Sequence, residues 1–430
     1  MRMRSEESVM IQPGPLPSSR NGKKVRWHSL YDKVTSPSNL LDAYQKVRRN
    51  RGAGGIDGVT LEMFEEKADA YLAFAEEKLK AKRYRARPVR RVHIPKPNGK
   101  KRPLGIPIIL DRIVQQALLN WLGPIYEATF SDVSYGFRPG RSALEAIEAV
   151  KGYLELGYRY VVEVDLEKYF DSVDHELLVR KLGEEFTDGS VLNLIKDFLQ
   201  TGVMEEGRWS ATDEGTPQGG VISPLLANVY LNSFDHLMVK QGYKLVRYAD
   251  DFVILCGTEE EANRAMAEVT RYLKAELHLR ISQEKSRIVD FTQESFTFLG
   301  YVFYGRFLRP KDRKISELKD EIRRLTRRQQ PGSVREIVMR LNTTLRGWSH
   351  YFCLGHIRAL TQRLDEWIRH RLRAFVNKRW GVFRGVKYAY PIERFTSMGL
   401  VSMYDLCYEL RILRTGLRRK AVYGKSVRTV

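Results

Sequence analysis

Three aspartates in two short apolar segments have the type and spacing of a catalytic metal site. Asp250 and Asp251 interrupt a β-branched and aromatic run between positions 245 and 255, which predicts a hairpin with both carboxylates at its tip. Asp165 ends a second apolar run that begins at Val161. An Asp-Asp pair alone is usually a solvated turn, but three converging carboxylates suit Mg²⁺. Two ions roughly 4 Å apart would promote in-line displacement, so the pattern indicates nucleotidyl transfer.

Two further motifs accompany these aspartates along the chain. One reads Asp165-Leu166-Glu167-Lys168-Tyr169-Phe170-Asp171, and the next reads Gly215-Thr216-Pro217-Gln218-Gly219-Gly220, before Tyr248-Ala249-Asp250-Asp251. In this order the motifs resemble the palm of a reverse transcriptase of the bacterial group II intron maturase type. The resemblance extends from about Ser38 to near the C-terminus. It implies an RNA-directed DNA polymerase that uses two Mg²⁺ ions.

The resemblance assigns metal and nucleotide contacts to individual residues. Asp165 and Asp250 match the principal metal ligands, assisted by Asp251 and Leu166. Phe170 matches the residue that lies beneath the nucleotide sugar and excludes a 2′-hydroxyl, although without the resemblance an ordinary core aromatic is preferred. The positions that the resemblance assigns to the incoming deoxynucleoside triphosphate are Lys96, Arg102, Leu166, Phe170 and Gln218.

Residues 88–107 alternate apolar with basic side chains and turn through Pro97-Asn98-Gly99-Lys100, which predicts a β-hairpin. Lys96 and Arg102 would lie near its tip, where a guanidinium suits bidentate phosphate binding. Charged hairpin tips are also commonly solvated. The glycine-rich stretch 51–58 likewise fits either a loop that approaches phosphate or a turn used for packing.

The charge of the chain is concentrated toward its C-terminus. The 430 residues carry a net charge of +21, and residues 311–430 alone hold 28 Lys and Arg against 10 Asp and Glu, a net +18. Such clustering indicates binding to a polyanion, whereas a basic surface kept for solubility would not explain it. For such a polyanion, the resemblance implies intron RNA, an RNA template and a DNA primer as partners.

Six arginines are assigned to RNA: Arg138, Arg141, Arg346, Arg369, Arg371 and Arg373. On a helix, Arg369 and Arg373 share one face while Ile368 and Leu372 point toward the core. The aromatic side chains of the same region fit RNA contacts, but their helical spacing favours the core. These aromatics are Trp348, Tyr351, Phe352 and Trp367.

The order of elements predicts an α+β fold with the right-hand polymerase arrangement of fingers, palm and thumb. The expected parts are a disordered basic N-terminal tail over 1–36, fingers over 37–160, a palm over 161–309, a helical thumb and maturase domain over 310–385 and a basic C-terminal segment over 386–430. Capping boxes at Ser142 with Glu145 and at Thr258 with Glu261 mark two helix starts.

Composition bounds the class of protein. No stretch approaches the ~20 apolar residues of a membrane span, and no export signal begins the chain, so we expect a cytoplasmic protein without a membrane partner. Cys256, Cys353 and Cys407 are far apart and odd in number, which favours packed thiols over disulfides or zinc.

The function predicted from these features combines polymerisation with binding of the intron RNA, splicing assistance and retrotransposition. Two alternatives stay open: a domesticated reverse transcriptase in defence or DNA repair without an intron partner, and an RNA-binding splicing factor without chemistry. Neither Cys pairs nor a His-Asn-His constellation follows the expected thumb, so the DNA endonuclease domain of some relatives is expected to be missing. The oligomeric state is left open.

Overall fold

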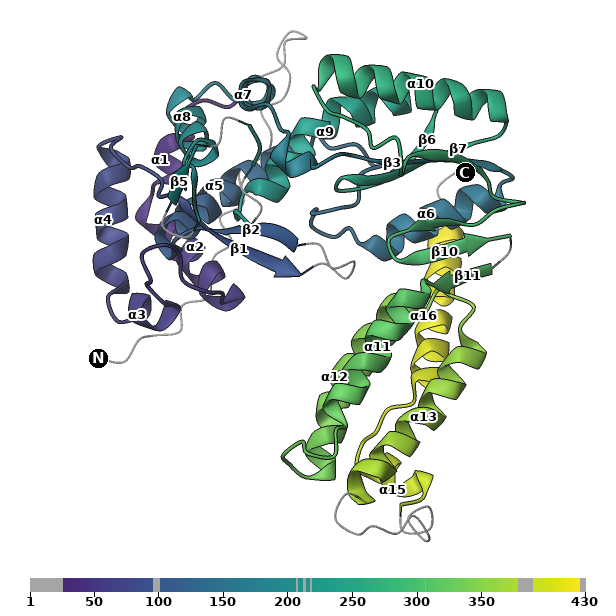
Figure 1. Ribbon diagram of the computed structural model, residues 1–430. Helices are drawn as coiled ribbons and strands as arrows, with labels where there is room; N and C mark the ends of the chain where they lie inside the picture. The colour runs from purple at the N-terminus through teal and green to yellow at the C-terminus, as the bar shows by residue number, and fades with distance from the viewer. Residues whose placement is uncertain are drawn as a thin grey trace. The chain divides into compact units, whose positions relative to one another are not determined.

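A computed structural model describes residues 26–95, 101–205, 208–211, 214–216, 219–305, 307–377 and 390–425. The chain forms two compact units (Figure 1). The first comprises Met1–Tyr158 and Val162–Ile288, and the second comprises Arg159–Val161 and Val289–Val430.

The N-terminal helices of the first unit pack around α5. Their bounds are α1 (Tyr31–Val34), α2 (Pro37–Asn50), α3 (Leu61–Glu65), α4 (Ala68–Lys80) and α5 (Ile109–Glu127). α2 begins at Pro37 because the Ser36 side chain accepts a hydrogen bond from the backbone N–H of Asn39, and proline suits the first helical position. The buried face of α2, which includes Leu40 and Val47, packs on α5.

The structure corrects part of the disordered tail expected over residues 1–36. Trp27 forms a parallel β-bridge with Phe186, and Leu30 and Val34 are fully buried. These apolar side chains enter a core built by distant segments, which the Pro- and Ser-rich local composition does not reveal. Residues 1–25 lie outside the described part of the chain.

The expected hairpin over 88–107 is present as β1 (Val89–Pro95) and β2 (Lys101–Ile106), which pair antiparallel. These strands join β4 (Val203–Glu205) and β5 (Arg208–Ser210) in a sheet of order β2-β1-β4-β5. The glycine-rich stretch 51–58 packs closely on this region, since a Cβ on Gly55 would lie 2.6 Å from the Ile108 backbone. That crowding favours the packing interpretation of the glycines.

A second sheet of order β6-β7-β3-β8 carries the predicted catalytic aspartates. Its strands are β3 (Tyr160–Asp165), β6 (Lys244–Tyr248), β7 (Asp251–Cys256) and β8 (Arg287–Asp290). The other elements of this part are α6 (Ala143–Glu155), η1 (Tyr169–Asp171), α7 (His175–Leu182), α8 (Gly189–Leu199), α9 (Ser223–Lys240) and α10 (Glu259–Glu276). α6 and α9 contact β6, and α10 contacts β7. The capping box of Ser142 and Glu145 is confirmed at the start of α6.

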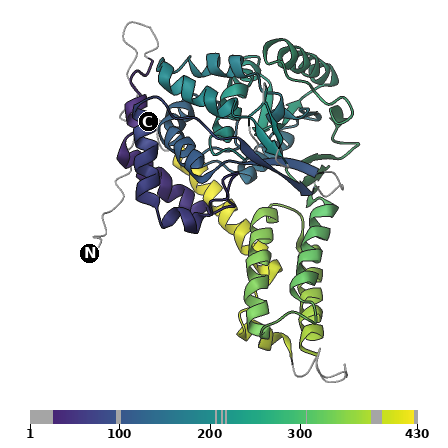
Figure 2. The same ribbon diagram turned by 60° about the vertical axis from the view of Figure 1, so that its left-hand side comes forward.

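The second unit joins a small sheet to long helices. The strands are β9 (Phe296–Phe298), β10 (Tyr301–Tyr304) and β11 (Phe307–Pro310), in the order β11-β10-β9. The helices are α11 (Asp312–Leu325), α12 (Val334–Phe352), α13 (Arg358–Val376), α15 (Ile392–Ser397) and α16 (Met403–Lys425). α11, α12 and α13 lie side by side (Figure 1 and Figure 2), and α16 contacts α12 and α13.

The core of this unit favours a packing role, rather than an RNA contact, for the aromatic side chains of its helices. Phe352 is buried, while Trp348 and Trp367 are partly buried against an apolar cluster that includes Ile368 and Leu372. Burial of those two aliphatic side chains confirms the predicted inner face of α13. The aromatic rings therefore stabilise the helical bundle.

The boundary between the compact units differs from the boundary expected between palm and thumb. The units separate after Ile288, whereas the sequence placed the end of the palm at 309. The ring of Tyr301 on β10 lies 5.1 Å from that of Phe352 on α12, and Tyr351 donates a hydrogen bond to the Leu299 carbonyl at 2.8 Å. These contacts tie the small sheet to the long helices.

Two expectations from composition can be compared with the described residues. Cys256, Cys353 and Cys407 are buried free thiols, as predicted. Among the helices that the structure describes, none combines the length and the apolar character needed to cross a membrane.

Candidate active site

The strand ends of the second sheet place Asp165 and Asp250 within electrostatic range of each other. Asp165 is the last residue of β3, and Tyr248 pairs with Asp251 at the end of the β6–β7 hairpin. Ala249 and Asp250 therefore form a two-residue turn. β7 lies between β6 and β3 in the sheet, and the charge of Asp165 at the end of β3 acts on Asp250 in this turn.

The electrostatics of Asp250 show which charges surround the turn. Burial is the main cause of a raised pKa at Asp250. The negative charge of Asp165 also raises this pKa, and the positive charge of Arg102 on β2 lowers it. Burial and a second carboxylate both disfavour the ionised form of Asp250. A cation bound beside this carboxylate would stabilise the ionised form. The fold thus places two acidic groups and one phosphate-binding candidate within electrostatic reach.

Lys285 is a neighbour of Asp165 that sequence reasoning missed. Its Nζ lies 3.1 and 3.2 Å from the two carboxylate oxygens of Asp165. The backbone N–H of Asp165 donates to Ser286 Oγ at 3.1 Å, and the N–H of Ser282 donates to the Asp165 carbonyl at 2.9 Å. The segment 282–286 therefore packs against the end of β3. No local signal points to the ion pair, because its partners are 120 positions apart.

The expected convergence of Asp165, Asp250 and Asp251 into one ligand cluster is not observed. Over the described ranges, no group of three or more His, Cys, Asp or Glu side chains is arranged to hold a metal ion. The side chain of Asp251 is exposed, and that of Asp165 binds Lys285. The donor set nevertheless fits a hard divalent cation, since two carboxylates lie in mutual electrostatic range and one already binds a cationic group.

Leu166 can contribute only backbone groups to such a site. Its side chain is 6% exposed, and its backbone forms an isolated antiparallel bridge with Ile281. The expected role of Leu166 in metal and nucleotide binding therefore falls on its carbonyl oxygen, because the side chain is apolar and buried.

Phe170 is placed by the glycine motif that follows it in sequence. The backbone N–H of Thr216 donates to the Phe170 carbonyl at 2.6 Å, and a Cβ on Gly215 would lie 2.8 Å from the same oxygen. The ring of Phe170 is only half-buried, whereas Tyr169 is the core residue, with its hydroxyl donating to the Ala227 carbonyl at 2.6 Å. The half-buried ring favours a surface role for Phe170.

His175 is a second residue that sequence reasoning missed. Its buried ring Nε2 lies 2.6 Å from the Gly215 carbonyl, which holds the glycine motif against α7. Gly219, with φ of +114°, leaves no room for a Cβ beside the Gly105 carbonyl on β2. Gly215 is thereby held against the segment that carries Phe170, and Gly219 against β2. The predicted nucleotide contacts Lys96 and Gln218 lie outside the described residues.

The structure gives Arg138 a role other than the expected RNA contact. Its guanidinium is buried and donates to both carboxylate oxygens of Glu127 and to the carbonyls of Ser131 and Ser134, at 2.7 and 2.8 Å. A group whose donors are engaged inside the protein is not available to phosphate. Arg141 is less enclosed and pairs with Asp132.

Two of the four arginines assigned to RNA in the second unit also have structural contacts. Arg371 donates to Thr326 Oγ1 at 3.0 Å, and Arg373 donates to the Tyr390 carbonyl at 3.0 Å and lies over the Phe395 ring. Removing either of these charges would therefore also remove contacts within the unit. Arg346 is exposed and Arg369 partly exposed.

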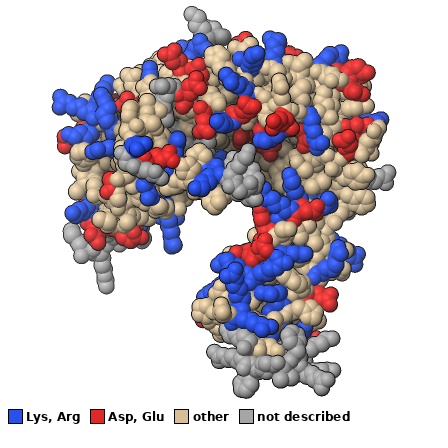
Figure 3. Space-filling model, in the orientation of Figure 1, with Lys and Arg blue, Asp and Glu red and all other residues tan. Residues whose placement is uncertain are grey.

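Other exposed arginines on the helices of the second unit provide a basic surface. Figure 3 shows Lys and Arg side chains gathered over these helices. Arg335 and Arg346 are eleven residues apart on α12, about three helical turns, so they share one face. Exposed basic side chains at a regular spacing suit the phosphates of a nucleic acid.

Comparison with known proteins agrees with this geometry. The family model "Reverse transcriptase (RNA-dependent DNA polymerase)" matches residues 94–303, and the model "Group II intron, maturase-specific domain" matches residues 315–390. Protein YkfC of Escherichia coli is 35% identical over 329 residues, which cover 67% of this chain and 85% of that protein.

The group II intron-encoded protein LtrA of Lactococcus lactis is 32% identical over 344 residues, covering 63% of this chain. The match spans only 56% of LtrA, about half of its length. A solved structure titled "Partial Cas6-RT-Cas1--Cas2 complex" is 26% identical, with a TM-score of 0.38 over 58% of this chain and 43% of that one. By its two matched domains and its relatives, the chain belongs to the family of reverse transcriptases that carry a group II intron maturase-specific domain.

Proposed function

We propose that the protein is an RNA-directed DNA polymerase that also binds a structured intron RNA and assists its splicing and retrotransposition. The main observation in support of polymerase activity is that Asp165 and Arg102 both lie within electrostatic reach of Asp250. The family membership supports the same reaction class. The RNA function rests on the basic helices of the maturase-specific region.

Each residue of the site has a distinct part in this proposal. Asp165 and Asp250, helped by Asp251 and the Leu166 carbonyl, would hold two Mg²⁺ ions. Bound there, such ions would activate the primer 3′-hydroxyl and neutralise charge on the departing pyrophosphate. Arg102 would bind the triphosphate through its guanidinium, which is permanently charged. Lys285 would have to leave Asp165 when the Mg²⁺ ions bind, because its ammonium group and the metal ions need the same carboxylate oxygens.

Primer extension tests the polymerase directly. Purified protein with an RNA template, a DNA primer, dNTPs and Mg²⁺ should lengthen the primer, and chelation of the metal should stop the reaction, since the carboxylates need a cation to bind phosphate oxygens. The measurement is product length on a denaturing gel. Failure to extend any primed RNA template with Mg²⁺ or Mn²⁺ present would leave only the RNA-binding function.

Removing charge from the exposed face of α12 tests the RNA function. Arg335→Gln with Arg346→Gln should weaken intron binding and flatten its salt dependence by a slope of about 0.7 to 0.9 for each lost phosphate contact. Extension of an unrelated template should stay near normal, because neither side chain is among the residues assigned to the catalytic site. The measurement is intron affinity from low to high salt, together with assisted splicing.

Arg323→Gln is the matched control for this pair. Arg323 is also exposed, but its guanidinium is paired with Asp320 at 2.6 Å and is partly neutralised. Its loss should therefore change the salt slope less than the loss of either α12 arginine. Equal losses of binding and extension in the α12 variant would assign that face to the primer and template, contrary to the proposal.

A further inference from the structure

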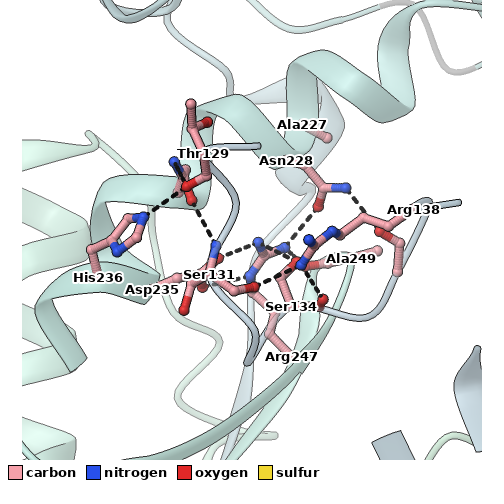
Figure 4. A network of polar contacts seen from close by, with 12 residues as sticks. Thr129, Ser131, Ser134, Arg138, Ala227, Asn228, Asp235, His236, Arg247 and Ala249 are labelled. Carbon is pink, nitrogen blue, oxygen red and sulfur yellow. Dashed lines mark hydrogen bonds and ion pairs between the residues drawn. The ribbon is translucent and has the colours of Figure 1, made fainter. Parts of the chain in front are cut away.

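Arg247, which immediately precedes Tyr248-Ala249-Asp250-Asp251, is a fully buried charge in the first unit. Burying a guanidinium is costly unless every N–H group finds an acceptor and the charge is paired. The side chain comes from β6 and is fully buried, and Figure 4 shows it among Ser134, Asn228 and Asp235. The groups that Arg247 contacts therefore indicate the role of this buried charge.

Each part of the Arg247 guanidinium has a partner. Nε donates to Asp235 Oδ1 at 2.7 Å, and Nη2 binds the other Asp235 oxygen. Nη2 also donates to Ser134 Oγ at 2.8 Å, and Nη1 donates to Asn228 Oδ1 at 3.0 Å. The remaining N–H donates to the Ala249 carbonyl at 2.8 Å, so all five donors of the group are used.

The contact with Ala249 acts on the catalytic turn itself. Ala249 has a φ of +59°, a left-handed conformation that side chains other than glycine disfavour. Its carbonyl belongs to the same rigid peptide plane as the N–H of Asp250. The Arg247 donor held on this carbonyl therefore fixes the orientation of the peptide group that leads into Asp250.

A loop from a distant part of the sequence holds the other side of this turn. The Arg247 N–H donates to the Val133 carbonyl at 2.9 Å, and the Tyr135 N–H donates to the Arg247 carbonyl at 2.8 Å. Asn228 Nδ2 donates to the Gly136 carbonyl at 2.8 Å, and a Cβ on Gly136 would collide with the Ala249 backbone. The loop thus packs directly against the turn that Arg247 binds.

We propose that Arg247 is a positioning residue for the polymerase reaction. Held by Asp235, Asn228 and Ser134, it fixes the Ala249–Asp250 peptide and so preorganises the Asp250 carboxylate for divalent cations. This inference rests on the proposed polymerase function. The competing explanation is that Arg247 only stabilises the core of the first unit.

Arg247→Lys tests the proposal, because an ammonium has three donors and cannot satisfy the planar set of acceptors. The rate of single-nucleotide incorporation should fall about 10- to 100-fold, the usual effect of losing a group that orients a metal ligand. The half-saturating Mn²⁺ concentration, followed through the EPR signal of the free ion, should rise by a similar factor. Both are measured below the unfolding temperature of the variant.

Tyr84→Phe is the matched control for stability. It removes a buried hydrogen bond of 2.7 Å to Asp111 in the same unit, with no contact to the catalytic turn. This variant should unfold at a lower temperature yet retain the incorporation rate and the Mn²⁺ affinity. Folded Arg247→Lys protein with wild-type rate and affinity would overturn the proposal, as would equal losses in both variants.

Two more variants keep the test decisive. Ala249→Gly adopts the left-handed conformation without steric cost, so in the Arg247→Lys background it should restore part of the rate and the Mn²⁺ affinity. If Arg247→Lys does not fold, Ser134→Ala removes one guanidinium contact and leaves the ion pair, and it should lower both quantities about threefold or more. No change in Ser134→Ala would then overturn the proposal. Inactive wild-type protein would instead refute the polymerase function before any variant is compared.

Discussion

Asp250→Asn is expected to abolish primer extension, with incorporation falling about 1000-fold or more because electrostatic stabilisation at the reacting phosphate is lost. Asparagine has nearly the size of aspartate, so the two-residue turn with Ala249 should persist. The amide lacks the negative charge that would bind a divalent cation and that interacts with the charge of Asp165. Single-turnover incorporation of one dNTP on an RNA template measures the effect.

Asp197→Asn is the control for a lost carboxylate in the same unit. Asp197 pairs with Arg85 at 3.4 Å on the surface, and its replacement should leave the rate unchanged. Asp251→Asn should reduce the rate less than Asp250→Asn does, since Asp251 is exposed and is proposed only to assist the other two aspartates. Intron binding should persist in all three variants. An Asp250→Asn protein that extends primers normally would show that the catalytic carboxylates lie elsewhere.

Phe170→Ala is expected to raise the incorporation of rNTPs relative to dNTPs about 10- to 100-fold, the range for filling or emptying one apolar contact in a substrate site. The half-buried ring follows β3, and its backbone carbonyl is fixed by the Thr216 N–H at 2.6 Å. The fixed backbone holds the Cα of Phe170 in place, so that the ring can fill the space that a 2′-hydroxyl would need. The measurement is the ratio of kcat/KM for each nucleotide pair.

Tyr169→Phe provides the control for Phe170→Ala. It removes the buried hydrogen bond to the Ala227 carbonyl next to the same segment and should lower stability without changing sugar selection. A selection ratio that is unchanged in Phe170→Ala would return Phe170 to a packing role. A ratio changed equally in both variants would indicate a general disturbance of η1.

Features that depend on near neighbours were predictable from the sequence. The β6–β7 hairpin with Asp250 in its turn, the capping box of Ser142 and Glu145, and the inner face of α13 all appear where the pattern places them. In each case the deciding interaction joins residues a few positions apart, or follows the period of a single element. The order of the motifs also sufficed to identify the family.

Features that depend on distant partners were not predictable in this way. Arg138, Arg371 and Arg373 are of the residue type expected at RNA contacts, yet each donates hydrogen bonds to acceptors within the protein. The Lys285–Asp165 pair and the Arg247 network likewise join segments far apart in the chain.

Which residue types are available, and which local element carries each of them, could thus be read from the order of residues along the chain. Whether a given charge is solvated, paired or buried depended on how distant segments fold together. The physical reason is that the free energy of a charged group depends on all the donors, acceptors and excluded water around it, and these come from the whole fold.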